Sequence, residues 1–442
     1  MTTKKDFLKK FSIYAVGNIS SKLIMFLLYP IMTFYLLPEE LGKFDVLLSI
    51  VMWLGALAML NMRDGAFRFV MTDNENVYRT VLGLFIKILI YNILILGIGA
   101  TVVYLMGVDL YFNPYLIVLF FLSFNFFEVY QQIIRGRGKT KLYVTANVIS
   151  AFLIAIITIL LLKTTPLKAE SLVIAYTISK LLATVYVEIV YPILFKKRER
   201  ITMSAIEDNN YSVKQILSYS LFLLPANLAI MGINNWGKLF FLYFDYNYIL
   251  GIYAIVVKFS NIFLVITTIY QQTWQECAIR DYNTNTADRS QYFTKYFNSY
   301  LLFLSLLVVA ITVGVGLFYK ILIAPEYYES LIYIPFQLLT VVFLALSFFL
   351  NLAYECSFEA KRAIYSALLA TMVSFVLNLI FIPMFGIKGG IIANIISSLT
   401  MFVYRMIDVR RYFILKLNKK GLLSILLFIL LFSGVILYNY YL

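Results

Sequence analysis

Residues 80–106 read TVLGLFIKILIYNILILGIGATVVYLM, an apolar run with a single charged side chain, Lys87. A helix of roughly 20 apolar residues is long enough to cross the hydrocarbon core of a bilayer, which is about 30 Å thick. The chain as a whole is 62% hydrophobic and 14% charged, whereas roughly a quarter of the residues of a soluble globular protein are charged. The sequence therefore predicts an all-α polytopic membrane protein.

Further apolar runs of this kind occur along the whole chain, and we expect about 13 membrane spans. The runs cover residues 11–36, 44–61, 80–106, 114–134, 142–162, 171–195, 215–243, 248–273, 297–319, 331–353, 363–386, 389–407 and 421–441. The longest connection follows the sixth run and divides the chain into two sets of six. We therefore predict four parts: an N-terminal lobe at 1–195, a cytoplasmic linker at 196–214, a C-terminal lobe at 215–408, and a basic loop with one additional helix at 409–442.

Lys and Arg residues are distributed unevenly over the connections between the runs. With the N-terminus placed in the cytoplasm, 27 of the 37 lie in inner segments, five in outer segments and five within the runs. The cytoplasmic loops of membrane proteins carry the excess of Lys and Arg. The net charge of +14 is thus explained by topology and not by nucleic-acid binding.

Short sequence matches between the two sets of six indicate an internal repeat. An offset of 209 residues pairs Leu41-Gly42 with Leu250-Gly251, and an offset of 222 pairs Lys139 with Lys361. Because six is an even number of spans, both halves begin on the same side of the membrane, which makes the repeat parallel. Parallel repeats related by an axis along the membrane normal are a common transporter architecture, with the substrate site between the halves.

Lysine side chains occur deep inside the apolar runs. Four of them lie well inside long runs, Lys22, Lys180, Lys238 and Lys258, although Lys238 is about five residues from the outer end of its run. An ionised side chain at this depth is costly and normally faces a polar cavity. Since we see no matching acids at the same depth, we expect these lysines to line a cationic cavity that binds an anion. The alternative is a lysine that extends to the headgroups, which suits Lys87 and Lys238 better than Lys22.

Other polar residues in the runs allow more than one interpretation. Asparagines can hold helices together or contact a sugar, and the spacing does not separate these roles for Asn227, Asn234 and Asn235. Three acids lie beside cytoplasmic cations, which favours structural ion pairs: Glu128, Glu188 and Glu355. Glu128 is the deepest of them and is a candidate to bind a coupling ion. The pair Asp64-Gly65 is typical of a turn.

The composition excludes several kinds of chemistry. The chain has no histidine, and its two cysteines, Cys277 and Cys356, fall on the expected cytoplasmic side. Histidine-based catalysis and zinc sites of the Cys/His type are therefore excluded. We find no Gly-rich phosphate loop, no nucleophile elbow and no metal-binding carboxylate cluster. We expect a protein that is not an enzyme and that holds neither a metal nor a cofactor.

Five segments, in this order, resemble polysaccharide flippases of the Wzx type. They are YPIMTFYLLPEELGKFD at 29–45, RDGAFRF at 63–69, QQIIRGRGK at 131–139, QTWQE at 272–276 and FGIKGG at 385–390. Such flippases belong to the multidrug/oligosaccharidyl-lipid/polysaccharide (MOP) exporter superfamily, with MATE drug exporters and lipid II flippases. The resemblance implies two six-helix lobes around a central cavity, in the inner membrane of a bacterium.

The resemblance also implies a cargo and a direction. The protein would turn an undecaprenyl-diphosphate-linked oligosaccharide from the cytoplasmic to the outer leaflet by alternating access, for the synthesis of capsule or lipopolysaccharide. Its partners would be this cargo, membrane lipids and other polysaccharide assembly proteins. Relatives often have an acidic–basic pair where this chain has Gly237-Lys238, which leaves the coupling ion open.

Two alternatives belong to other functional classes. A MATE-like exporter of cationic small molecules needs a central acid to bind its substrate or coupling ion, and the runs show none at mid-depth. A membrane glycan polymerase or glycosyltransferase carries its catalytic residues on large outer loops. Every predicted outer loop here is shorter than roughly 15 residues, which is too short for a folded catalytic lid.

Overall fold

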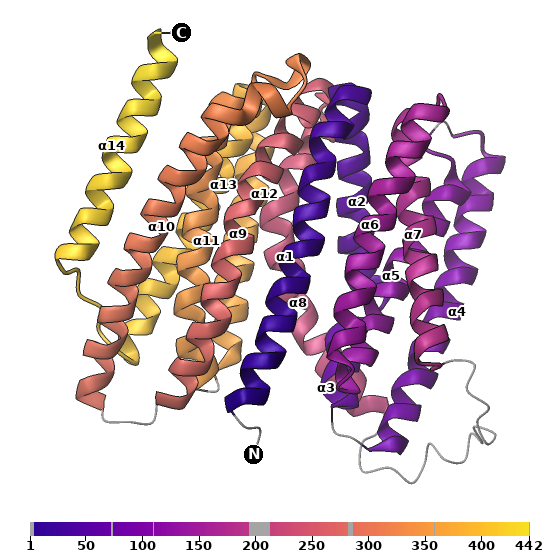
Figure 1. The fold of residues 1–442 in the computed structure, drawn as a ribbon, viewed down its shortest axis with the longest axis horizontal. Helices are drawn as coiled ribbons and strands as arrows, with labels where there is room; N and C mark the ends of the chain where they lie inside the picture. The colour runs from indigo at the N-terminus through magenta and orange to yellow at the C-terminus, as the bar shows by residue number, and fades with distance from the viewer. Residues whose placement is uncertain are drawn as a thin grey trace. The chain divides into compact units, whose positions relative to one another are not determined.

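A computed structural model describes residues 4–71, 74–108, 110–193, 213–281, 286–357 and 359–441. These residues form α-helices, two short 3-10 helices and no strand (Figure 1), which confirms the all-α prediction. The first helices are α1 (Lys4–Tyr35), α2 (Pro38–Ala58), α3 (Met62–Val70), α4 (Glu75–Leu105), α5 (Pro114–Gly136), α6 (Thr140–Thr164) and α7 (Lys168–Val190). They are followed by α8 (Val213–Tyr243), α9 (Asn247–Asp281), α10 (Thr286–Leu322), α11 (Ser330–Cys356), α12 (Ala360–Phe385), α13 (Ile387–Asp408) and α14 (Lys419–Tyr441).

Most of these helices are long and apolar enough to cross a membrane. Within the described residues, 11 helices meet this description, and Ser20–Tyr35 of α1 forms a shorter apolar helix. The chain is therefore a polytopic membrane protein by helix length and composition. The exact count of 13 spans stays a prediction.

The helices form two compact units. The first contains Met1–Leu36 and Lys43–Leu228, and the second contains Leu37–Gly42 and Ala229–Leu442. The division therefore falls within α8, while most of the linker predicted at 196–214 lies outside the described residues. The boundaries of the predicted lobes stay a prediction.

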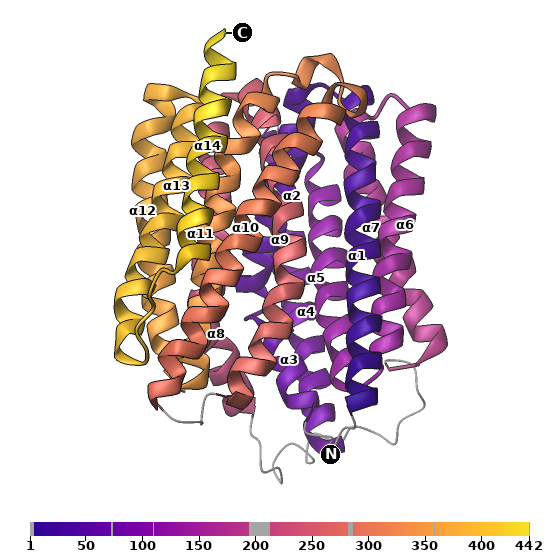
Figure 2. The ribbon, with the colours of Figure 1, turned by 60° about the vertical axis from the view of Figure 1, so that its left-hand side comes forward.

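Apart from α3 and α14, the described helices form two sets that follow one another in the same order, α1–α7 and α8–α13. The 209-residue offset carries the first residue of α1, Lys4, onto that of α8, Val213, and likewise Pro38 of α2 onto Asn247 of α9. Helix α7 packs on α5 and α6 in the first unit, as α13 packs on α11 and α12 in the second (Figure 2). The 222-residue offset misses the starts of α6 and α12 by two residues, because these helices begin at Thr140 and Ala360.

The two copies differ at the end of α2. There the chain turns at residues 59–61, and both Leu60 and Asn61 have left-handed backbones, with φ of 50° and 52°. A short polar side chain tolerates this conformation, but a leucine does not adopt it without strain. The turn expected at Asp64-Gly65 is wrong, because both residues lie inside α3. In the second unit α9 continues as one helix through the equivalent position, Tyr270.

The first turns of α2 and α9 touch through glycines that belong to the second unit. A Cβ atom added to Gly251 would lie 1.9 Å from the carbonyl oxygen of Pro38, and one added to Gly42 would lie 2.7 Å from the backbone nitrogen of Gly251. Both distances are shorter than real Cβ contacts. The absence of a side chain at Gly251 therefore permits this approach of the two backbones.

The last helix is fastened to α10 by its leading segment, residues 413–418 (Figure 1). Three polar side chains at i, i+4 and i+8 on α10 bind the backbone of this segment: Ser290, Thr294 and Asn298. Asn298, which is fully buried, donates to the carbonyl oxygen of Lys416 at 2.8 Å and accepts from the backbone N–H of Asn418 at 3.0 Å. Phe413 stacks on Phe293 with ring centroids 4.1 Å apart. Helix α14 is thus an integral part of the second unit.

Candidate functional site

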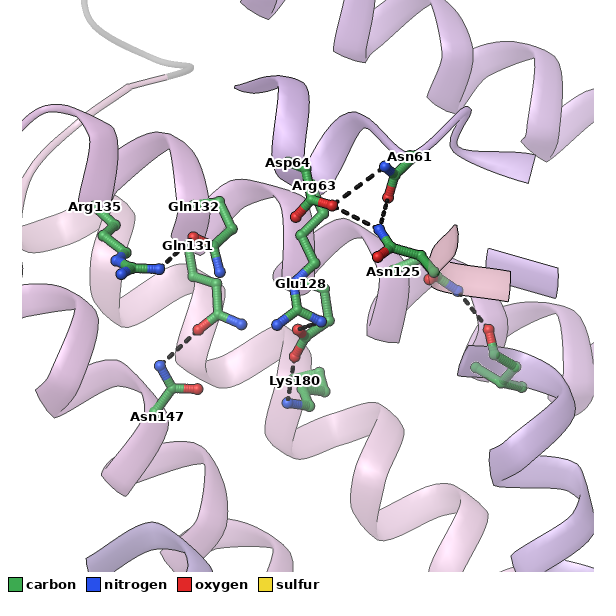
Figure 3. A network of polar contacts seen from close by, with 12 residues as sticks. Asn61, Arg63, Asp64, Asn125, Glu128, Gln131, Gln132, Arg135, Asn147 and Lys180 are labelled. Atoms are coloured by element: carbon green, nitrogen blue, oxygen red, sulfur yellow. Dashed lines mark hydrogen bonds and ion pairs between the residues drawn. The ribbon is translucent and has the colours of Figure 1, made fainter. Parts of the chain in front are cut away.

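Helix α5 carries a polar stripe on one face within an otherwise apolar sequence. Asn125, Glu128, Gln132 and Arg135 are spaced by three, four and three residues, so they share a face of the helix. Figure 3 shows this stripe with the partners of Glu128 from α3 and α7, and with Asn147 of α6, which donates to the neighbouring Gln131.

The centre of the network is an acid between two cations. Glu128 Oε1 lies 3.6 Å from Lys180 Nζ on α7, and Glu128 Oε2 lies 3.5 Å from an Arg63 guanidinium nitrogen on α3 (Figure 3). The side chain of Lys180 is 9% exposed and that of Glu128 19%, whereas that of Arg63 is 54% exposed. The ammonium of Lys180 also lies 4.3 Å from the ring centroid of Phe127. The ion triad therefore has a buried end and an open end.

The left-handed turn at residues 59–61, called the corner below, holds the backbone at Arg63 in place. Asn61 donates to Asp64 and to the backbone carbonyl of Ser220 on α8, each at 3.2 Å. Asn227, also on α8, donates to Asp64 at 2.7 Å and to Asn61 at 3.2 Å. These bonds tie the corner to α8 and to the first turn of α3. They fix the direction in which α3 leaves α2.

The cytoplasmic end expected for α5 has a second group of charges. Arg135 lies 4.3 Å above the ring of Phe67, and Arg137 donates to Glu75 at 2.8 Å. Burial lowers the pKa of Arg137, but the hydrogen bond and the charge of Glu75 raise it, and the net pKa is raised. Among the described residues, no group of three His, Cys, Asp or Glu side chains could hold a metal ion.

The four deep lysines have different surroundings. Lys22 is exposed on α1 and has no hydrogen-bond or ion-pair partner among the described residues. Lys180 and Lys238 are buried, 8% and 5% exposed, in the first and second unit respectively. Lys258 is half-buried on α9. The expectation that the deep cations have no matching carboxylate is wrong for Lys180, because Glu128 on the neighbouring helix α5 is its ion partner.

The asparagines and the remaining acids also differ in their contacts. Asn227 ties α8 to α3, while Asn235 donates to the carbonyl of Met231 on its own helix at 2.8 Å. The side chains of Asn234 and Glu355 lie outside the described part of the chain. Glu188 accepts hydrogen bonds from the hydroxyl of Tyr130 and, at 2.9 Å, from the backbone N–H of Ile193. A further buried acid, Asp45 on α2, was not among the predicted site residues.

Two substitutions of Asn61 test whether its hydrogen bonds and its left-handed backbone affect stability. Asn61→Ala removes the side-chain bonds and keeps a left-handed backbone that costs alanine about 1–2 kcal/mol. Asn61→Gly removes the same bonds without that cost. We therefore expect both variants to have a lower melting temperature in detergent, with the alanine variant the less stable. Equal melting temperatures would show that backbone strain at this corner does not contribute to stability.

Several solved structures are similar to this fold. No family model and no curated protein matches the sequence. Among solved structures, the chain is similar to an inward-facing MATE multidrug resistance transporter of the MOP superfamily, with TM-score 0.64, 14% identity and coverage of 90% of this chain and 98% of that chain. It is also similar to the lipid II flippase MurJ in an inward closed conformation, with TM-score 0.65, 13% identity and coverage of 97% and 98%. A third similar structure is the MATE multidrug transporter DinF-BH, with TM-score 0.60, 13% identity and coverage of 90% and 95%.

These similarities extend over nearly the whole length of both chains. The protein therefore has the two-lobed, all-helical fold that MATE transporters and MurJ share. At this level of identity, the comparisons define the fold, and the cargo has to be argued from the residues of this chain.

Proposed function

We propose that the protein is a flippase for an anionic lipid-linked oligosaccharide, with undecaprenyl diphosphate as the carrier lipid. The cargo would pass from the cytoplasmic to the outer leaflet of a bacterial inner membrane by alternating access, for surface polysaccharide synthesis. The N-terminus would lie in the cytoplasm. No covalent step is involved, so the protein would act as a transporter and not as an enzyme. Its fold supports this proposal, since one protein with that fold is a lipid II flippase.

The observation that carries the proposal is the state of Lys22. This lysine lies midway along the apolar run 11–36, its side chain is exposed, and no described residue is its ion partner. An ionised side chain at membrane depth needs a counter-charge, water or a polar cavity. Lys180 has its counter-charge in Glu128. An anionic cargo would supply the counter-charge for Lys22.

The burial of the other lysines divides their roles. Lys22 and the half-buried Lys258 are the more exposed of the four, and we propose that they contact the diphosphate. Lys180 and Lys238 would act from inside their units by adding positive charge near the cargo path. Asn235 would contact sugars, whereas Asn227 is engaged with α3.

The MATE-like alternative requires an acid that is free to bind a cation. Each oxygen of Glu128 already faces a cation, so ion coupling through Glu128 would require Arg63 or Lys180 to move away first. The anionic-cargo proposal agrees with the net positive charge of Arg63, Lys180 and Glu128 taken together, which attracts an anion and repels a cation. It is therefore the better supported of the two.

Deletion of the gene in its native host tests the proposal directly. We expect surface polysaccharide to be lost and its lipid-linked repeat unit to accumulate in the cytoplasmic leaflet, with recovery from a plasmid copy. The measurement is immunoblotting of surface glycan together with mass spectrometry of extracted lipids. Unchanged surface glycan combined with new sensitivity to cationic dyes would support the exporter alternative instead.

A further inference from the structure

The residues of the ion triad have no charged counterparts at the aligned positions of the second repeat copy, where a different acid, Asp408, lies between Arg362 and Arg411. When α5 and α11 are aligned at their first residues, Glu128 corresponds to Leu344; the same alignment of α7 and α13 pairs Lys180 with Leu399. The 209-residue offset pairs Arg63 with Gln272. Because α13 packs on α11 and α12 without the charges of Glu128 and Lys180, the corresponding packing of α7 on α5 and α6 does not require this ion pair. This asymmetry indicates a role in function.

The two ion pairs of the triad are unequal. The pair between Glu128 and Lys180 is buried, and separating it would leave an uncompensated charge inside the unit. The pair between Glu128 and Arg63 is 3.5 Å long and its guanidinium is 54% exposed. Ion pairs open to solvent contribute little, and the median is about 0–1 kcal/mol. Arg63 can therefore leave Glu128 at small cost, while Lys180 cannot.

The ion triad carries a net charge of +1. Arg63 and Lys180 bring two positive charges and Glu128 one negative charge. Phosphate oxygens accept two parallel hydrogen bonds from a guanidinium and carry more negative charge than a single carboxylate. An arriving phosphate or diphosphate would thus compete well for Arg63.

We propose that Glu128 is a resident counter-ion, and that the phosphate group of an anionic ligand replaces it at Arg63. In the empty protein Glu128 holds both cations. When the ligand binds, Arg63 turns from Glu128 to the phosphate, while Glu128 stays with Lys180. This proposal rests on the proposed function for its natural ligand, a lipid diphosphate, but the exchange itself needs only a phosphate or diphosphate anion.

The fold supports an exchange that moves one side chain and not a helix. Asn61, Asp64 and Asn227 fix the start of α3 through hydrogen bonds of 2.7–3.2 Å. The backbone at Arg63 is therefore held, and the flexible part is its side chain. Gly65 also lies against α8, where a Cβ atom would be 2.0 Å from the hydroxyl of Ser220. The turn at residues 59–61 thus fixes the backbone position of Arg63, while its guanidinium can bind either Glu128 or a phosphate.

Binding measurements on the purified full-length protein in nanodiscs test the exchange. The probes are geranylgeranyl diphosphate and inorganic pyrophosphate, with geranylgeraniol as the uncharged reference. We expect Arg63→Gln to weaken binding of both diphosphates by about 10- to 150-fold, the effect of losing a charge-assisted hydrogen bond. We expect Glu128→Gln to tighten it several-fold, because the internal competitor is gone. Arg68→Gln, which changes an exposed arginine on the same helix, is the matched control and should leave binding unchanged.

A second variant covers the case in which Glu128→Gln does not fold because Lys180 loses its partner. The double variant Glu128→Gln/Lys180→Met removes both members of the buried pair and should still bind diphosphate more tightly than the wild type. Weaker binding by this double variant, or equal effects of Arg63→Gln and Arg68→Gln, would overturn the proposal. Tighter binding of the prenyl probe than of pyrophosphate would identify a lipid as the source of the phosphate, and equal binding would identify a soluble anion.

The outcomes separate this inference from the proposed function. If the deletion strain keeps its surface glycan while Arg63 and Glu128 respond as expected, the exchange stands and the cargo is another phosphate. If glycan export requires Lys22 but Glu128→Gln leaves diphosphate affinity unchanged, the exchange is wrong and the flippase proposal is not affected.

Discussion

Lys22→Ala is expected to abolish surface glycan, or to reduce it severely, while the protein still reaches the membrane in normal amounts. The side chain lies at mid-depth, is exposed and has no ion partner among the described residues, so the cargo anion would be its counter-charge. A charge-assisted contact is worth about 1.5–3 kcal/mol, which corresponds to roughly 10- to 150-fold in affinity. The measurement is complementation of a deletion strain, with surface glycan and protein abundance determined on the same cells.

Two further variants make the Lys22 result specific. Lys22→Arg keeps the charge and should retain part of the activity. Lys87→Ala removes an exposed lysine from the apolar run at 80–106 and should have little effect, because Lys87 is close enough to the membrane surface to extend to the headgroups. Normal export by Lys22→Ala would refute the anionic-cargo proposal, and so would greater damage from Lys87→Ala.

Gly251→Ala is expected to have the largest effect on stability. The added Cβ atom would meet the carbonyl oxygen of Pro38 at 1.9 Å, and backbone cannot rotate away as a long side chain can. The first turn of α9 would have to move from residues 37–42. Overpacking of this kind typically costs about 1–3 kcal/mol. We expect a clear fall in the melting temperature of the detergent-solubilised protein, together with loss of export.

Gly314→Ala is the matched control for Gly251→Ala. Gly314 lies inside α10, and a Cβ atom added there meets no atom within 4 Å. Alanine is favoured over glycine in a helix interior by about 1 kcal/mol, so this variant should be at least as stable as the wild type. Similar melting temperatures for the two variants would mean that the contact at Gly251 does not constrain the protein.

The fold was predictable from the sequence because each membrane helix is a local feature. An apolar run such as 80–106 can satisfy its backbone in lipid only as a helix, and the structure has α4 there. The 209-residue offset was also readable, since Leu41-Gly42 and Leu250-Gly251 lie at the same turn of α2 and α9. The left-handed turn at Leu60 and Asn61 was not predictable, because leucine rarely adopts this backbone and the side-chain hydrogen bonds that hold the turn involve α8.

The candidate site was predictable in part. The depth of Lys180 identified it as a residue in need of a partner, but the partner is 52 positions away on α5, and pairing across helices does not show in a sequence. One signal was available and was missed. Asn125, Glu128, Gln132 and Arg135 follow helical spacing within an apolar run, and that pattern predicts a polar face before any partner is known.

The fastening of residues 413–418 to α10 bears on how the chain is synthesised. Asn298 is buried, and its amide group is satisfied in part by Lys416 and Asn418, which emerge from the ribosome more than a hundred residues later. Until then α10 would present Ser290, Thr294 and Asn298 to the surroundings with these bonds unmade. The polar contacts of α10 are therefore completed only after residues 413–418 have been synthesised, and a chain that stops before them would leave these side chains of α10 without their partners.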